Sequence, residues 1–158
     1  MSGHTIVIGV GNALRGDDAA GVEVVERLRD RVPPGVVVAA CDEEPSRLIE
    51  AWAGADAVVL VDTVASGARV GTLHRFDAGE TPIPARVLRS STHAIGLAET
   101  IELARALGKL PPRVVVYGIE GASFAAGAPL TPAVEESVGR LVETILGDLE
   151  EVACTSAP

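Results

Sequence analysis

The chain has 158 residues and a formal net charge of −9 at pH 7, and 47% of its residues are hydrophobic but only 3% are aromatic. This length allows one domain with a sizeable core, which has to be built from Val, Leu, Ile and Ala side chains. The acidic balance argues against nucleic-acid binding, because nucleic-acid phosphates attract basic surfaces.

The first half of the chain alternates predicted strands with predicted helices. Continuous apolar runs at Thr5–Val10, Val36–Ala40 and Ala57–Val61 predict strands covered on both faces, since a half-exposed strand would alternate polar and apolar residues. Apolar residues at helical spacing predict a helix over residues 19–32, between the first two strands. A shorter helix is expected over Pro45–Trp52, because proline suits the first helical turn.

The second half continues the same alternation. Gly71–Phe76 is a weaker strand candidate, expected to be short and to lie at an edge of the sheet. A helix is expected over His93–Leu107 and a strand over Val114–Gly118. Thr131 is a natural N-cap and Pro132 suits the following position, so a final helix is expected to begin there.

The alternation of strands and helices predicts parallel βαβ units, with right-handed crossovers and helices on both faces of one sheet. No long linker or internal repeat interrupts the chain, so residues 1–153 are expected to form a single domain. Residues 154–158 are expected to form a frayed C-terminal tail.

The turn after the first strand, Gly9–Gly21, is rich in glycine and carries two acids, Asp17 and Asp18. Glycine-rich turns that lead into a helix often bind phosphate, but two carboxylates would repel it. The nucleotide motifs also fail in detail, since Leu14 replaces the third glycine of the dinucleotide motif and Asp17 replaces the lysine of a P-loop. Acids at an exposed helix start favour a cation site, although helix capping by one acid is an alternative.

Three side chains that bind divalent metals are predicted at one edge of the sheet. Asp18 follows the first strand, Asp62 follows the third, and His93 stands at the entrance to the next helix. Because ligands collect beyond the carboxyl ends of the strands in such a sheet, we expect these residues to line one crevice. Two carboxylates and an imidazole form a plausible three-ligand site for Zn²⁺ or Ni²⁺. Taken singly, each residue also has a structural explanation, such as turn capping by Asp62.

Other residues that could take part in catalysis or ligand binding are less strongly indicated by the sequence. Cys41 ends the second strand and could act as a nucleophile, but a buried free cysteine usually behaves as a small apolar residue. Glu120 could line the crevice. His4 and His74 have no acidic or cysteine partner at ligand spacing, and both are expected to be exposed.

At these residues the chain resembles the hydrogenase maturation endopeptidases, which trim the C-terminus of the large subunit of [NiFe]-hydrogenases. The resemblance runs from Ile6 to about Leu149. It rests on the segments Gly9–Gly21, Val61–Thr63, His93–Leu97, Gly118–Glu120 and Leu130–Glu135. It implies a three-layer α/β/α sandwich with a central twisted, mostly parallel five-stranded sheet.

The same resemblance implies a set of site residues and a metal. Asp18, Asp62 and His93 correspond to the family's catalytic and metal-binding residues, although Asp18 replaces the commoner Glu and reaches less far. Family members cut only after nickel has entered the precursor, so the metal is expected to be nickel carried by the substrate. Zn or Ni could bind the isolated protein. An aspartic-type and a metal-assisted mechanism are both open.

One departure from the family pattern concerns substrate recognition. Many members carry an Asp-Gly-Gly-Thr-like loop after the second strand, whereas this chain has Cys41–Pro45 without glycine. Asp42 keeps the acid of that loop and is therefore a weak candidate for substrate recognition. Glu120, which could line the crevice, is a second weak candidate.

The expected partner is the hydrogenase large-subunit precursor, met in the cytoplasm by a monomer that binds neither membrane nor nucleic acid. These expectations follow because the first residues lack the basic region and long apolar stretch of a signal peptide, and the sequence shows no membrane-length apolar run and no disulfide framework. Three alternatives stay open: a metal-binding maturation chaperone without protease activity, a spore-type endopeptidase on a related fold, and a cysteine hydrolase using Cys41.

Overall fold

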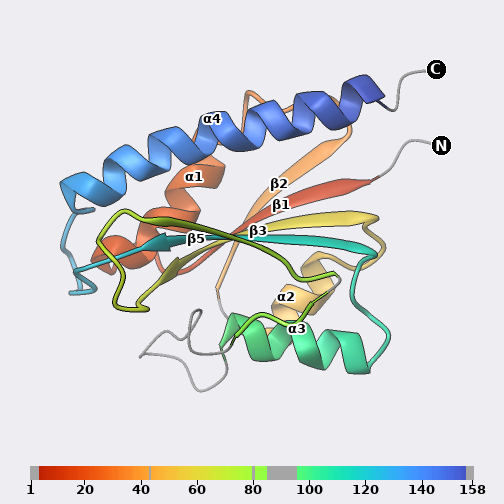
Figure 1. Cartoon of the computed structure of the whole chain (residues 1–158), viewed down its shortest axis with the longest axis horizontal. Helices are drawn as coiled ribbons and strands as arrows, with labels where there is room; N and C mark the ends of the chain where they lie inside the picture. The colour runs from red at the N-terminus through yellow and green to blue at the C-terminus, as the bar shows by residue number, and fades with distance from the viewer. Residues whose placement is uncertain (1–3, 43, 80, 85–95, 156–158) are drawn as a thin grey trace.

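The computed structural model describes residues 4–42, 44–79, 81–84 and 96–155, and His93 therefore lies outside the described residues. These residues form a five-stranded sheet between two pairs of helices (Figure 1). The elements are β1 (Thr5–Val10), the 3₁₀ helix η1 (Gly16–Ala19), α1 (Ala20–Leu28), β2 (Val36–Cys41), α2 (Pro45–Ala51), β3 (Ala57–Val64), β4 (Leu73–Asp77), α3 (Leu97–Ala106), β5 (Arg113–Glu120) and α4 (Pro132–Thr155).

The strands follow the order β2-β1-β3-β5-β4, and only the edge strand β4 runs antiparallel to its neighbour. Helices α1 and α4 cover one face of the sheet, and α2 and α3 cover the other (Figure 1). The predicted mostly parallel α/β/α sandwich is thus confirmed, as is the placement of a weak fifth strand at an edge. None of the helices in the described ranges is long and apolar enough to cross a membrane.

The core divides into two aliphatic clusters, one on each face of the sheet. Alternate residues of β1 serve the two clusters: Ile6 and Ile8 pack toward α2 and α3, and Val7 packs toward α1 and α4. Trp52 is the largest buried side chain, and its indole N–H donates to the carbonyl oxygen of Lys109 at 3.0 Å. The composition of this core matches the expectation from a chain that is poor in aromatic residues.

Two central strands extend further than their apolar runs. Strand β3 continues past Val61 to Val64, because its last residues pair with β5 up to Val64 and Glu120. Asp62 and Glu120 therefore lie within strands rather than in the loops after them. At the C-terminus, α4 continues through Thr155, two residues into the segment that was expected to fray.

Helix α1 lies unusually close to the ends of β1 and β3. A Cβ atom on Gly21 would lie 2.4 Å from the carbonyl oxygen of Val61, and a Cβ atom on Gly9 would lie 2.1 Å from that of Gly21. Both distances are far below van der Waals contact, so only glycine allows this approach. The glycine-rich turn therefore fixes η1 and its acids against the carboxyl edge of the sheet.

Candidate active site

The parallel strands β2, β1, β3 and β5 end at one edge of the sheet, which we call the carboxyl edge. Their register places Val10 beside Cys41, Gly9 beside Val61, and Val64 beside Glu120. The residues that the sequence singled out near these ends are Asp18 in η1, Asp42 after β2, Asp62 in β3 and Glu120 in β5. The carboxyl edge therefore gathers acids that are distant in the sequence.

Asp18 is a buried acid at the start of the helical segment. Its side chain is 4% exposed, and Oδ2 accepts a hydrogen bond from the backbone N–H of Asn12 at 3.1 Å. The N-cap residues of η1 and α1 are Arg15 and Ala19, and neither makes a side-chain capping bond. Simple helix capping, the structural alternative for this acid, is not the arrangement found.

Asp62 is likewise buried, with 1% of its surface exposed. Its Oδ1 accepts the backbone N–H of Thr63 at 2.7 Å. The neighbouring residue, Thr63, connects β3 to the turn after β1, because its hydroxyl donates to the carbonyl oxygen of Asp17 at 2.6 Å. Direct hydrogen bonding between their neighbours thus holds the segments that carry Asp18 and Asp62 together.

The third predicted ligand, His93, lies outside the described residues. Within the described ranges no group of three or more His, Cys, Asp or Glu side chains has an arrangement that could hold a metal. The described part of the predicted site consists of two buried carboxylates, Asp18 and Asp62. Carboxylate oxygens are suitable donors for a divalent ion such as Zn²⁺ or Ni²⁺, so this part fits the expected metal chemistry.

Asp17 has a role that sequence reasoning missed. It is fully buried, and its carboxylate accepts the backbone N–H groups of Ala122, Ser123 and Thr131 at 2.8–3.0 Å, together with the Thr131 hydroxyl. The sequence indicated Asp17 only as one of two acids in the glycine-rich turn, whereas the structure shows it bound to a distant loop. It joins the β1–α1 turn to the β5–α4 loop, and its partners are more than 100 residues away, so no local pattern indicates them.

Glu120 and His74 form a second buried arrangement at the end of β5. The Glu120 side chain is 2% exposed and accepts the backbone N–H of Ser66 at 2.8 Å and its hydroxyl at 2.5 Å. His74 Nε2 lies 3.1 Å from Glu120 Oε1, so the expectation that His74 is exposed without an acidic partner is wrong. Glu120 fixes the loop after β3, and a direct contact with a substrate would require these bonds to open. His4, by contrast, is exposed as expected.

The residues at the end of β2 are more exposed than the buried acids Asp18 and Asp62. Asp42 is exposed and forms an ion pair with Arg47 at 2.5 Å, so it is accessible to a substrate. Cys41 is partly buried against the core cluster between the sheet and helices α2 and α3, and this burial raises the pKa of its thiol. A raised pKa lowers the fraction of reactive thiolate at neutral pH, which argues against Cys41 as a nucleophile.

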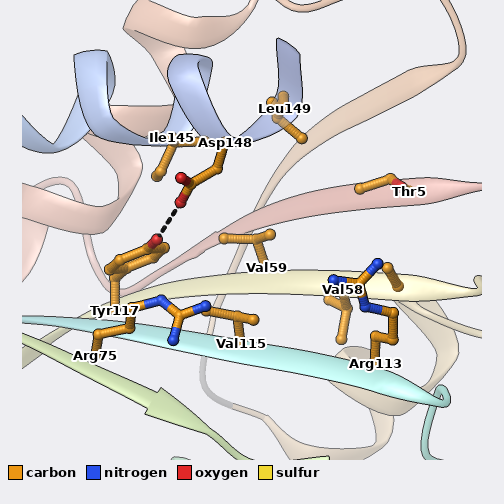
Figure 2. A pocket seen from close by; sticks show the side chains of 11 residues that line it. Thr5, Val58, Val59, Arg75, Arg113, Val115, Tyr117, Ile145, Asp148 and Leu149 are labelled. Atoms are coloured by element: carbon orange, nitrogen blue, oxygen red, sulfur yellow. Dashed lines mark hydrogen bonds between the residues drawn. The ribbon is translucent and has the colours of Figure 1, made fainter. Parts of the chain in front are cut away.

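A pocket of about 260 Å³ lies between α4 and the face of the sheet, and its lining includes the first residues of β1, β3 and β5 (Figure 2). The Tyr117 hydroxyl donates to Asp148 of α4 at 2.7 Å, and the Arg75 guanidinium lies 5.9 Å from the centre of the Tyr117 ring. Burial raises the pKa of Tyr117, which keeps the hydroxyl protonated as a donor. This pocket includes none of the predicted catalytic residues, and its Tyr–Asp bond ties α4 to β5.

Comparison with known proteins identifies the family. The sequence model of the hydrogenase maturation protease family matches residues 22–148, and the chain belongs to this family. Hydrogenase 2 maturation protease of Escherichia coli (strain K12) is 29% identical over 156 residues, which cover 97% of this chain and 94% of that protein.

Solved structures agree with this assignment. The hydrogenase maturating endopeptidase HybD from E. coli has a TM-score of 0.80 and 28% identity, over 94% of this chain and 93% of that one. The [NiFe] hydrogenase maturation protease HycI from Thermococcus kodakarensis KOD1 has a TM-score of 0.74 and 29% identity, over 93% and 92% of the two chains. The fold is therefore that of a hydrogenase maturation protease.

Proposed function

We propose that this protease removes the C-terminal peptide from a nickel-loaded [NiFe]-hydrogenase large-subunit precursor, and that it does so in the cytoplasm. The observation that carries the proposal is the pair of buried aspartates, Asp18 and Asp62, at the carboxyl edge of a hydrogenase maturation protease fold. Two buried carboxylates suit a cation that arrives with the substrate. Burying a carboxylate costs free energy, and coordination of a metal offsets this cost.

In this proposal, Asp18, Asp62 and His93 contact the nickel that the precursor carries. Nickel held there would supply Lewis-acid polarisation of the scissile carbonyl, and a carboxylate would accept a proton from the attacking water. Asp62 suits this role, since its Oδ1 accepts the Thr63 N–H and this bond fixes the carboxylate's orientation. Asp42 is an exposed acid on the same edge, and we assign it a contact with the substrate near the cut.

The main alternative is a metal-binding maturation chaperone that holds the precursor without cutting it. The assignment of the chain to a protease family favours cleavage. The cysteine hydrolase alternative has less support, because burial raises the pKa of the Cys41 thiol.

We expect the protease to distinguish nickel-loaded from nickel-free precursor. Purified precursor in each form is incubated with the enzyme, and the cleaved fraction is followed by intact mass spectrometry. The loaded form should be cut, and the nickel-free form should stay intact because it brings no metal to the carboxylates. Precursor loaded with Zn²⁺ is the matched control for a general effect of metal on the precursor's fold. Equal cleavage of the nickel-loaded and nickel-free forms would contradict nickel recognition.

A further inference from the structure

Two loops beside Asp18 form an exposed surface with few charged side chains. We call residues 11–15 and 121–130 the edge loops; Arg15 is their only Asp, Glu, Lys or Arg residue, in a chain whose net charge is −9. The second loop exposes mainly small apolar residues, among them Ala122, Ala125, Ala126 and Pro129. In Figure 1 the segment between β5 and α4 lies beside the start of α1, at the carboxyl edge.

Leu14 is the most prominent apolar group on this surface. Four large hydrophobic side chains are exposed in the described ranges, and Leu14 is the most exposed of them at 75%. The others are Val37 in β2, Leu103 in α3 and Leu107 just after α3, none of which lies in the edge loops. Single exposed hydrophobic residues are common, so exposure alone does not indicate a binding role for Leu14. Its position next to Asp18 does.

Hydrogen bonds hold Leu14 in a fixed place next to the aspartate. Its backbone N–H donates to Asn12 Oδ1 at 2.9 Å, and its carbonyl oxygen accepts the N–H of Gly127 at 2.8 Å. The N–H of Asn12 in turn donates to Asp18 Oδ2 at 3.1 Å. One short chain of bonds thus connects the exposed leucine to the proposed metal ligand and to the second edge loop.

Asp17 joins the second edge loop to the turn that precedes α1. Its carboxylate accepts N–H groups from Ala122 and Ser123, and its own N–H donates to the Ser123 carbonyl oxygen at 2.7 Å. Loops that are held by such hydrogen bonds lose less conformational entropy when a partner binds than loops without them. The edge loops are therefore suited to contact a folded protein.

We propose that the edge loops are the docking surface for the folded precursor, with Leu14 as the apolar contact next to the segment that is cut. This inference rests on the proposed function. The matching surface on the precursor is mainly apolar, because Arg15 is the only charge that the edge loops offer to compensate a desolvated ion. Docking there places the precursor's nickel and C-terminal segment at a fixed position relative to Asp18.

The test measures binding of nickel-loaded precursor to Leu14→Ala and Leu14→Glu by calorimetry. Leu107→Ala and Leu107→Glu are matched controls, since Leu107 is also an exposed leucine, at 55%. We expect Leu14→Ala to weaken binding about tenfold and Leu14→Glu to weaken it more, whereas the Leu107 variants bind like the wild type. Melting temperatures should stay unchanged, and KM for the precursor should rise more than kcat falls.

The outcomes separate the docking surface from the proposed function. Equal affinities of the Leu14 and Leu107 variants would overturn the docking surface, whether or not the wild type cuts the precursor. A wild type that binds through Leu14 but does not cut would support the docking surface and overturn the proposed function. A wild type that neither binds nor cuts would overturn both.

Discussion

Replacing Asp62 with Asn should abolish precursor processing while the protein stays folded. The amide oxygen can still accept the Thr63 N–H, so the local structure is kept. The charge is lost, however, and an amide is a poor ligand for a transition metal. We expect the processing rate to fall by more than about a hundredfold, since even changes around metal ligands cost about 10–100-fold. Asp18→Asn should behave in the same way.

The measurement is the rate of cleavage of nickel-loaded precursor, read together with thermal melts. Asp148→Asn is the matched control, because it also removes an aspartate that accepts a hydrogen bond, but one in α4 that lines a pocket without any of the predicted catalytic residues. Asp18→Glu should retain processing, since it restores the carboxylate with one more methylene. A fully active Asp62→Asn enzyme, or one that loses activity only by unfolding, would show that these aspartates have a structural and not a catalytic role.

Replacing Asp17 with Asn should destabilise the fold strongly. The carboxylate is fully buried and accepts three backbone N–H groups and a hydroxyl, whereas an amide would direct its own N–H donors at some of these donors. Losing a buried charged acceptor costs about 3 kcal/mol of unfolding free energy or more. For a domain of this size, that corresponds to a melting temperature lower by roughly 10 °C.

Differential scanning calorimetry measures this change, and Asp30→Asn is the matched control, because Asp30 is an exposed acid that follows α1. Activity should fall in step with stability, since Asp17 also fixes the loops beside Asp18. An Asp17→Asn protein that melts within about 1 °C of the wild type would show that these hydrogen bonds contribute little.

The fold could be predicted from the sequence because its strands are continuous apolar runs. Strand β1 was predicted with its observed bounds, Thr5–Val10. The ends of β3 and β5 were missed, because Asp62 and Glu120 interrupt the apolar pattern although both side chains are buried. Burial of polar residues depends on partners that the local sequence does not show.

The part of the candidate site that lies at the carboxyl ends of the strands could be predicted from the sequence. Asp18 and Asp62 reach the same edge because parallel strands direct their carboxyl ends to one side. The roles of Asp17 and His74 were not predictable, since each depends on a residue brought near by the tertiary fold. Asp17 contacts Thr131 of the last loop, and His74 meets Glu120 on the neighbouring strand.

The most direct test of the central claim is the mass of the products formed from nickel-loaded large-subunit precursor. Hydrolysis of one peptide bond predicts a shortened large subunit and one C-terminal peptide, whose masses sum to that of the precursor plus one water. Both products should be seen with the wild type and be absent with Asp62→Asn. A precursor that binds the wild-type protein but keeps its full mass would contradict the protease assignment and favour the chaperone alternative.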